Sequence, residues 1–159
     1  MDDMDVYVSY AEADREAIRE LCTHLAPLEQ NGGFRIWHSG LLFAGEDASS
    51  VSAERFMAAT VIVILVSADY LADPQCLAET ERAVERAKRG EVRIVPVLVR
   101  KCLTDATSLA SFRFLPKSGQ PVMAYQERAD VWSEIASALR EIPERRPARS
   151  GASAAPVAL

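Results

Sequence analysis

Apolar residues along this chain fall into short aliphatic runs, separated by longer stretches in which they recur every three or four positions. The most continuous run, Val61-Ile62-Val63-Ile64-Leu65-Val66, is typical of a strand buried on both faces of a sheet. A longer stretch carrying Ile18, Leu21 and Leu25 is typical of a helix with one apolar face. Strands are expected at 5–9, 34–37, 61–66, 92–99 and 121–124, and helices at about 18–28, 48–58, 74–88, 109–115 and 130–142.

Strands that alternate with helices predict a doubly wound α/β fold, in which helices cover both faces of a parallel sheet. The 159 residues are enough for one domain with a proper core. From residue 144 to residue 159 the chain is rich in alanine, serine and proline, which is typical of a flexible tail or linker. We therefore expect one domain at 1–143 and a tail at 144–159.

Charge and composition argue against several classes of protein. A net charge of −5 argues against a nucleic-acid surface, which needs a basic face. The longest apolar stretch, around 57–68, is too short for a membrane span of about 20 residues. The acidic N-terminus lacks the features of a signal peptide, so a cytoplasmic protein is expected. Cys22, Cys76 and Cys102 include no C-x-x-C pair, so we expect neither a disulfide framework nor a bound metal.

Glu79 is the strongest candidate for a catalytic side chain, because of where it follows the central strand. Ser67 leaves that strand at its carboxyl end, and Asp73 and Pro74 supply an N-cap and a first-turn proline for the next helix. Glu79 then falls near the start of that helix, close to the edge where open α/β sheets bind ligands. An isolated helical glutamate is more often a solvated surface residue, and this alternative stays open.

The loop at 38–47 is unusual because it places Leu41, Leu42 and Phe43 in succession, with Gly45 near its end. Loops run over the protein surface, where three adjacent bulky apolar residues are uncommon. The pattern indicates either a loop folded back over the core or a surface for a partner or ligand.

Several familiar sites are absent from the sequence. The junction Ser9-Tyr10-Ala11-Glu12 contains no glycine, which argues against a Rossmann dinucleotide site and a P-loop. A response-regulator receiver needs an acidic pair at the carboxyl end of the first strand, but Asp2, Asp3 and Asp5 lie at the opposite end. The G-x-S-x-G turn of a serine hydrolase is missing as well.

Five segments in the right order and spacing resemble the Toll/interleukin-receptor (TIR) domain family, especially its bacterial stand-alone and effector forms. The resemblance covers about residues 4–142. Its segments are Asp5-Val6-Tyr7-Val8-Ser9-Tyr10, the loop from Trp37 to Glu46, the stretch from Leu65 to Leu71 followed by Cys76-Leu77-Ala78-Glu79, the strand Ile94-Val95-Pro96-Val97-Leu98-Val99, and Val131-Trp132.

The resemblance implies a flavodoxin-like three-layer sandwich, with a five-stranded parallel sheet and helices on both faces. It also implies an NAD⁺ glycohydrolase that cleaves the nicotinamide–ribose bond with Glu79 as the catalytic residue, giving nicotinamide and ADP-ribose or a cyclised product. NAD⁺ is then a substrate, and no cofactor is expected. The residues expected to line the nucleotide pocket are Ser9, Tyr10, Trp37, Phe43 and Ser67, although Tyr7 and Trp37 fit core aromatics equally well.

For partners, the resemblance implies self-association through TIR–TIR contacts, into an oligomer or filament. The assembly loop would comprise Leu41, Leu42, Phe43 and Gly45, and it would gate or complete the site across protomers. A fused or separate sensor module and a role in bacterial antiphage defence are implied in the same way. Other members of the family are scaffolds that only bind TIR domains, so a non-catalytic interaction module is the alternative function.

Overall fold

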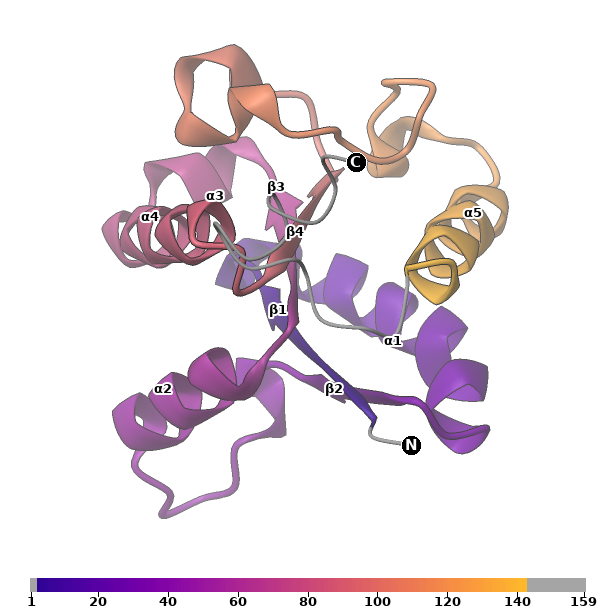
Figure 1. Ribbon diagram of the computed structural model, residues 1–159. Coiled ribbons are helices and arrows are strands. Elements are labelled where there is room, and N and C mark those ends of the chain that lie inside the picture. Colours follow the sequence, from indigo (N-terminus) through magenta and orange to yellow (C-terminus); the bar gives the residue numbers. More distant parts are fainter. Residues whose placement is uncertain (1–2, 143–159) are drawn as a thin grey trace, which may run out of the picture.

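A computed structural model describes residues 3–142, and its centre is a four-stranded sheet in the order β2-β1-β3-β4 (Figure 1). All three strand pairings are parallel, which confirms the expected α/β class. Residues 144–159, where a flexible tail is predicted, lie outside the described residues, so the tail and the domain boundary stay predictions. The strands are β1 (Met4–Ser9), β2 (Phe34–Trp37), β3 (Val61–Val66) and β4 (Arg93–Leu98).

Helices cover both faces of the sheet, as the sequence predicts (Figure 1). On one face lie α1 (Arg15–Gln30) and α5 (Arg128–Arg140), and on the other lie α2 (Ala48–Ala58), α3 (Ala68–Ala72) and α4 (Pro74–Lys88). The remaining connections include short 3₁₀ helices at Glu12–Asp14, Ser39–Leu41, Thr104–Ala106, Ser108–Ser111 and Val122–Ala124.

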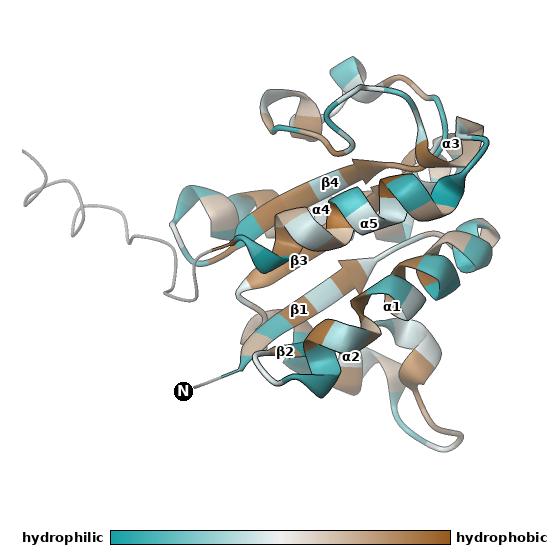
Figure 2. Cartoon of the chain, turned by 90° about the vertical axis from the view of Figure 1, so that its right-hand side faces the viewer, coloured by the Kyte–Doolittle hydropathy of each residue, from teal (hydrophilic) through white to brown (hydrophobic). Residues whose placement is uncertain are grey.

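The central strand β3 supplies both cores. All six of its residues are buried, as expected for a strand covered on both faces. Val61, Val63 and Leu65 face the core beneath α1 and α5, whereas the residues between them face α2, α3 and α4. In Figure 2, apolar colours concentrate on β3 and β4, and the helices carry much of the polar colour. Alternate side chains of β3 therefore pack against the two helical layers, one set on each face of the sheet.

The expectation of a fifth strand at 121–124 is wrong. Val122–Ala124 is a 3₁₀ helix, and the position beside β4 holds only a one-residue parallel bridge between Leu115 and Val97. Leu115 donates its N–H to the carbonyl of Pro96 at 2.9 Å and accepts from the N–H of Leu98 at 2.8 Å. The next residue is a proline without an N–H, so the ladder cannot continue. The helix expected at 109–115 is likewise reduced to the 3₁₀ turn Ser108–Ser111.

The start of α4 matches the sequence prediction in detail. Asp73 is the N-cap, and its carboxylate accepts from the backbone N–H of Gln75 at 2.8 Å and of Cys76 at 3.4 Å. Pro74 occupies the first helical position, where its missing N–H has no intrahelical partner to lose. The cap fixes the register of α4 and therefore places Glu79 in its second turn.

Candidate functional site

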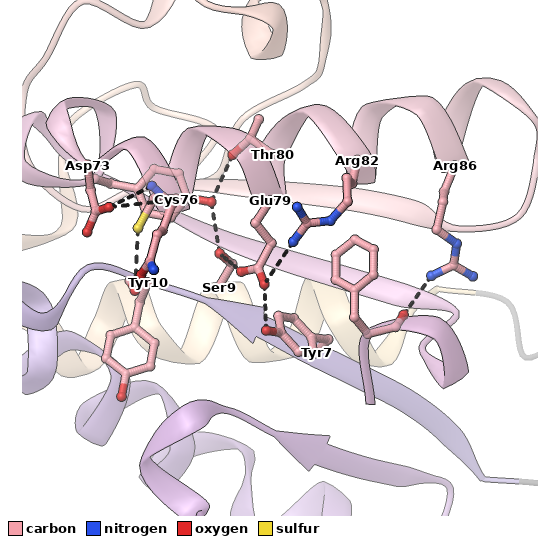
Figure 3. Close-up of polar contacts among 12 residues, drawn as sticks. Tyr7, Ser9, Tyr10, Asp73, Cys76, Glu79, Thr80, Arg82 and Arg86 are labelled. Carbon is pink, nitrogen blue, oxygen red and sulfur yellow. Dashed lines mark hydrogen bonds and ion pairs between the residues drawn. The ribbon is translucent and has the colours of Figure 1, made fainter. Parts of the chain in front are cut away.

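The carboxylate of Glu79 lies beside the carboxyl end of β1, where two hydroxyl groups hold it (Figure 3). Tyr7 Oη donates to Oε2 at 2.7 Å, and Ser9 Oγ donates to Oε1 at 2.6 Å. Tyr7 and Ser9 are buried, whereas 20% of the Glu79 side chain is exposed. Hydrogen bonds to an ionised acceptor are short and strong, so the carboxylate is fixed at the boundary between core and solvent.

Two further hydroxyls extend this arrangement into the core. Tyr70 Oη lies 2.8 Å from Ser9 Oγ and 2.8 Å from Thr80 Oγ1. Because Ser9 gives its single proton to the carboxylate, Tyr70 must donate to Ser9, and Thr80 must then donate to Tyr70. Three hydroxyls in series therefore point their protons toward Glu79, and such a chain is mutually polarising.

The local sequence explains why these side chains meet. Tyr7 and Ser9 are two residues apart on β1 and so face the same side of the sheet, toward α4. On α4, Glu79 is half-buried above the end of β1, and Thr80 beside it is buried against Tyr70. The site thus follows from strand alternation and from the register of one capped helix.

A cleft of about 880 Å³ opens over Glu79, between α2 and α4. Its lining includes Ser9 and Tyr10 from the end of β1 and the residue after it, Phe56 from α2, and Glu79 and Arg82 from α4. This volume falls within the range of pockets that hold small ligands and nucleotides. Glu79 is therefore both firmly held and open to a ligand.

Arg86 is a buried cation that joins the two walls of the cleft (Figure 3). Its Nη1 donates to the carbonyl of Phe56 at 2.7 Å, and its Nη2 lies 3.4 Å and 3.3 Å from the carbonyls of Met57 and Ala59. Its Nε donates to a carboxylate oxygen of Glu91 at 3.1 Å. These carbonyls lie at the C-terminal end of α2, where Phe56 also accepts from the N–H of Ala59 at 3.3 Å and the later carbonyls lack the donors of a further helical turn. Arg86 therefore sets the separation of α2 from α4.

The protonation of the cleft residues follows from their burial. Burial, together with the Glu79 carboxylate, raises the pKa of Tyr7 far above its usual value, and burial raises the pKa of Tyr70. Both phenols therefore stay protonated donors at physiological pH. Burial, reinforced by the Asp73 carboxylate, raises the pKa of the Cys76 thiol to about 12. Cys76 is consequently a neutral thiol rather than a nucleophile.

Alkaline unfolding tests the protonation of these phenols. Folded Tyr7 and Tyr70 hold their protons more tightly than the unfolded chain does, so their stabilisation is complete below about pH 10 and is lost above it. We expect the urea midpoint to fall progressively above about pH 10, and Tyr7→Phe to reduce that slope. Tyr125→Phe, which removes a hydroxyl that contacts exposed Ser118, is the control. An equal slope in wild type and Tyr7→Phe would contradict this assignment.

The structure brings together some of the predicted pocket residues and separates others. Ser9 and Tyr10 line the cleft with Glu79. Trp37 is instead buried against Tyr7, with ring centroids 5.5 Å apart, and Ser67 is fully buried at the N-cap of α3. Phe43 does not line the cleft either. The roles of these residues in nucleotide binding stay predictions.

The predicted assembly loop is partly exposed. Phe43 is 78% exposed and Leu41 is 47% exposed, whereas Leu42 is half-buried against the core beneath α2 and α4. Gly45 has a φ of +90°, a backbone conformation that favours glycine. Leu42 therefore folds back toward the core, whereas Leu41 and Phe43 project outward, and the role of the loop in binding a partner or ligand stays a prediction.

Sequence reasoning missed several members of the site. Tyr70 and Thr80 were not singled out, and Tyr7 was considered only as a core aromatic. The signal for Tyr7 is its position two residues before Ser9 on the same strand. Arg82, which was also not singled out, follows Glu79 by three residues on the helix. A second hollow of about 910 Å³ is lined by residues of α1 together with Tyr10 and His38, and its lining does not include Glu79.

Within residues 3–142, no helix is long and apolar enough to span a membrane. In the same part of the chain, no group of three or more His, Cys, Asp and Glu side chains is arranged to hold a metal ion.

Comparisons with known proteins agree with the observed fold. A family model described as TIR domain matches residues 6–128. The uncharacterized protein y4lF of Sinorhizobium fredii is 30% identical over 161 aligned residues, covering 96% of this chain and 50% of that protein. The chain thus spans about half the length of this curated relative.

A solved structure has a similar fold. It is the crystal structure of the TIR domain of the Toll-related receptor TRR-2 from Hydra magnipapillata, with a TM-score of 0.61 and 17% sequence identity. The match covers 87% of this chain and 99% of that domain, and at this identity it shows a shared fold. The match of the family model over residues 6–128 shows that the chain belongs to the TIR domain family.

Proposed function

We propose that this TIR domain is an NAD⁺ glycohydrolase with Glu79 as its catalytic carboxylate. The observation that carries the proposal is the position of Glu79, partly exposed in the cleft and held by Tyr7 and Ser9 at 2.7 Å and 2.6 Å. Each carboxylate oxygen accepts one of these hydroxyls and keeps a second lone pair for a ligand. The side chain can therefore accept hydrogen bonds from a ribose diol without giving up its own support.

The proposed reaction suits a site with one carboxylate. When the C1′–N bond of NAD⁺ breaks, its electron pair moves to the pyridine nitrogen, and nicotinamide leaves as a neutral molecule. No general acid is needed, and positive charge develops on the ribose as an oxocarbenium ion. A fixed carboxylate beside the ribose stabilises that charge. Water then adds to C1′ and loses a proton, giving ADP-ribose, or an internal nucleophile closes a cyclic product.

Self-association is the second part of the proposal. The exposed side chains Leu41 and Phe43 lie in the loop between β2 and α2, and α2 forms one wall of the cleft. A neighbouring protomer bound to this loop would order the entrance to the site. A cytoplasmic location, a sensor module beyond the chain and a role in antiphage defence belong to the same proposal, on the strength of the family resemblance.

The function is tested by incubating the purified chain with NAD⁺ over a range of protein concentrations and measuring nicotinamide by chromatography. The proposal predicts release whose rate per protein molecule increases with concentration, as the chains associate. Absence of nicotinamide at concentrations where sedimentation shows assembly would contradict the enzyme and favour the scaffold.

The exposure of Phe43 and Leu41 fits the alternative function equally well, a non-catalytic module that binds other TIR domains. Both functions predict that Phe43→Ala weakens association, by about tenfold in dissociation constant if the side chain is buried at the contact. Analytical ultracentrifugation measures this effect. Leu103→Ala, which removes a side chain that is 75% exposed on another loop, is the matched control. Equal association of Phe43→Ala and wild type would exclude this loop as the contact.

A further inference from the structure

Three arginines line the cleft, and they differ in how firmly they are bound. Arg86 is buried and engaged by the end of α2 and by Glu91, as described above. Arg89 donates through Nε to Glu91 at 2.8 Å. Arg82 has 60% of its side chain exposed, and within residues 3–142 its polar partner is Glu79, with 4.0 Å between Arg82 Nη2 and Glu79 Oε2. Arg82 is therefore the cation in this cleft that is freest to bind a ligand.

The Phe56 ring holds the Arg82 guanidinium in place, although the ion pair between Arg82 and Glu79 is weak. The guanidinium carbon of Arg82 lies 5.7 Å from the ring centroid of Phe56, across the cleft on α2, which holds the group over an aromatic face. Figure 3 shows its nitrogens turned toward the Glu79 carboxylate. Because an exposed ion pair at 4.0 Å contributes little stability, an anionic ligand can draw the guanidinium away at low cost.

A carboxylate and a guanidinium side by side define the ligand that fits them. The carboxylate accepts from a diol, and the guanidinium donates two parallel hydrogen bonds to a phosphate. Because Glu79 and Arg82 lie three residues apart on α4, the two groups face the same part of the cleft.

We infer that Arg82 is a specificity-determining residue that selects 5′-phosphorylated ribose, by binding the phosphate while Glu79 holds the diol of the same sugar. This inference rests on the proposed function, because it assigns a ribose to Glu79. It makes the site selective for nucleotides over nucleosides. Arg82 then contributes to binding, and Glu79 contributes to bond cleavage.

The test compares adenosine 5′-monophosphate with adenosine, which differ only in the phosphate and contain no nicotinamide bond to be cleaved. Backbone amide shifts of β1 and α4 report their dissociation constants. Wild type should bind the nucleotide about tenfold more tightly or better, since hydrogen bonds to charged groups are the stronger kind. Arg82→Ala should bring the ratio close to one with adenosine affinity unchanged, and Arg82→Lys should retain part of it. Arg55→Ala, which removes an exposed arginine of α2 that does not line the cleft, should keep the wild-type ratio.

The outcomes separate this inference from the function beneath it. If both ligands bind the site and Arg82→Ala leaves their ratio unchanged, or weakens both equally, the inference is overturned and the glycohydrolase proposal stands. If neither ligand shifts the amides around Glu79 in the folded wild type, no ribose is bound there, and both proposals fall. Loss of the ratio in Arg82→Ala alone supports the inference.

Discussion

Replacing Glu79 with glutamine is expected to lower the rate of nicotinamide release from NAD⁺ by about 10³-fold. The amide has the shape of the carboxylate but lacks its negative charge, so it cannot stabilise the positive charge that develops on the ribose. One of its two polar groups is also an NH₂ donor, which leaves either Tyr7 or Ser9 facing a donor instead of an acceptor. Steady-state release of nicotinamide, measured at equal protein concentration, gives the ratio of rates.

The matched control for this variant is Glu85→Gln. Glu85 lies on α4 and lines the same cleft, but it is not part of the hydroxyl network. The Glu85→Gln variant loses the same charge from the same helix but keeps the carboxylate of Glu79. We therefore expect a rate close to that of wild type. Sedimentation should show unchanged assembly in both variants. A rate for Glu79→Gln equal to that of Glu85→Gln would mean that the carboxylate of Glu79 is not catalytic.

Replacing Arg86 with methionine is expected to lower the free energy of unfolding by about 3 kcal/mol. The methionine fills much of the volume of the buried arginine stem, so the main loss is polar. It removes the side-chain donor to the carbonyls of Phe56 and Ala59 at the end of α2, and it removes one of the two arginine partners of Glu91. Urea unfolding followed by circular dichroism measures the change.

Arg89→Met provides the comparison, because Arg89 pairs with the same Glu91 but has 56% of its side chain exposed. We expect a change of less than about 0.5 kcal/mol, as is usual for exposed pairs. Stability losses of similar size in the two variants would show that Arg86 does not hold α2. A large loss confined to Arg86→Met would confirm that this buried cation joins the cleft walls.

The sequence predicted the parts of the fold that depend on local chemistry. The run Val61–Val66 is the central strand because six aliphatic residues can be buried on both faces only in a covered sheet. The N-cap at Asp73 and the proline after it set the start of α4 to the residue. Once that start is known, Glu79 must lie near the end of β1, because parallel strands end at one edge.

The remaining features depend on contacts between distant segments. The hydrogen bond between the hydroxyls of Ser9 and Tyr70 joins residues 61 positions apart, and no local sequence pattern predicts it. The sequence also could not show that Trp37 packs on the buried ring of Tyr7 instead of facing the cleft. The expectation of a fifth strand at 121–124 was wrong because a short apolar segment resembles a strand in sequence whether or not it pairs. In the structure only Leu115 pairs with the outer edge of β4.

Chemical rescue tests directly whether the carboxylate at position 79 is needed to break the nicotinamide–ribose bond. Glu79→Ala leaves a space beside the hydroxyls of Tyr7 and Ser9, where formate can bind in place of the lost carboxylate. Nicotinamide release is measured for wild type and Glu79→Ala, each with and without formate. We expect Glu79→Ala to be inactive without formate and its nicotinamide release to be restored by formate in a saturable way, with wild type unaffected. Wild-type rates from Glu79→Ala without formate would contradict this expectation.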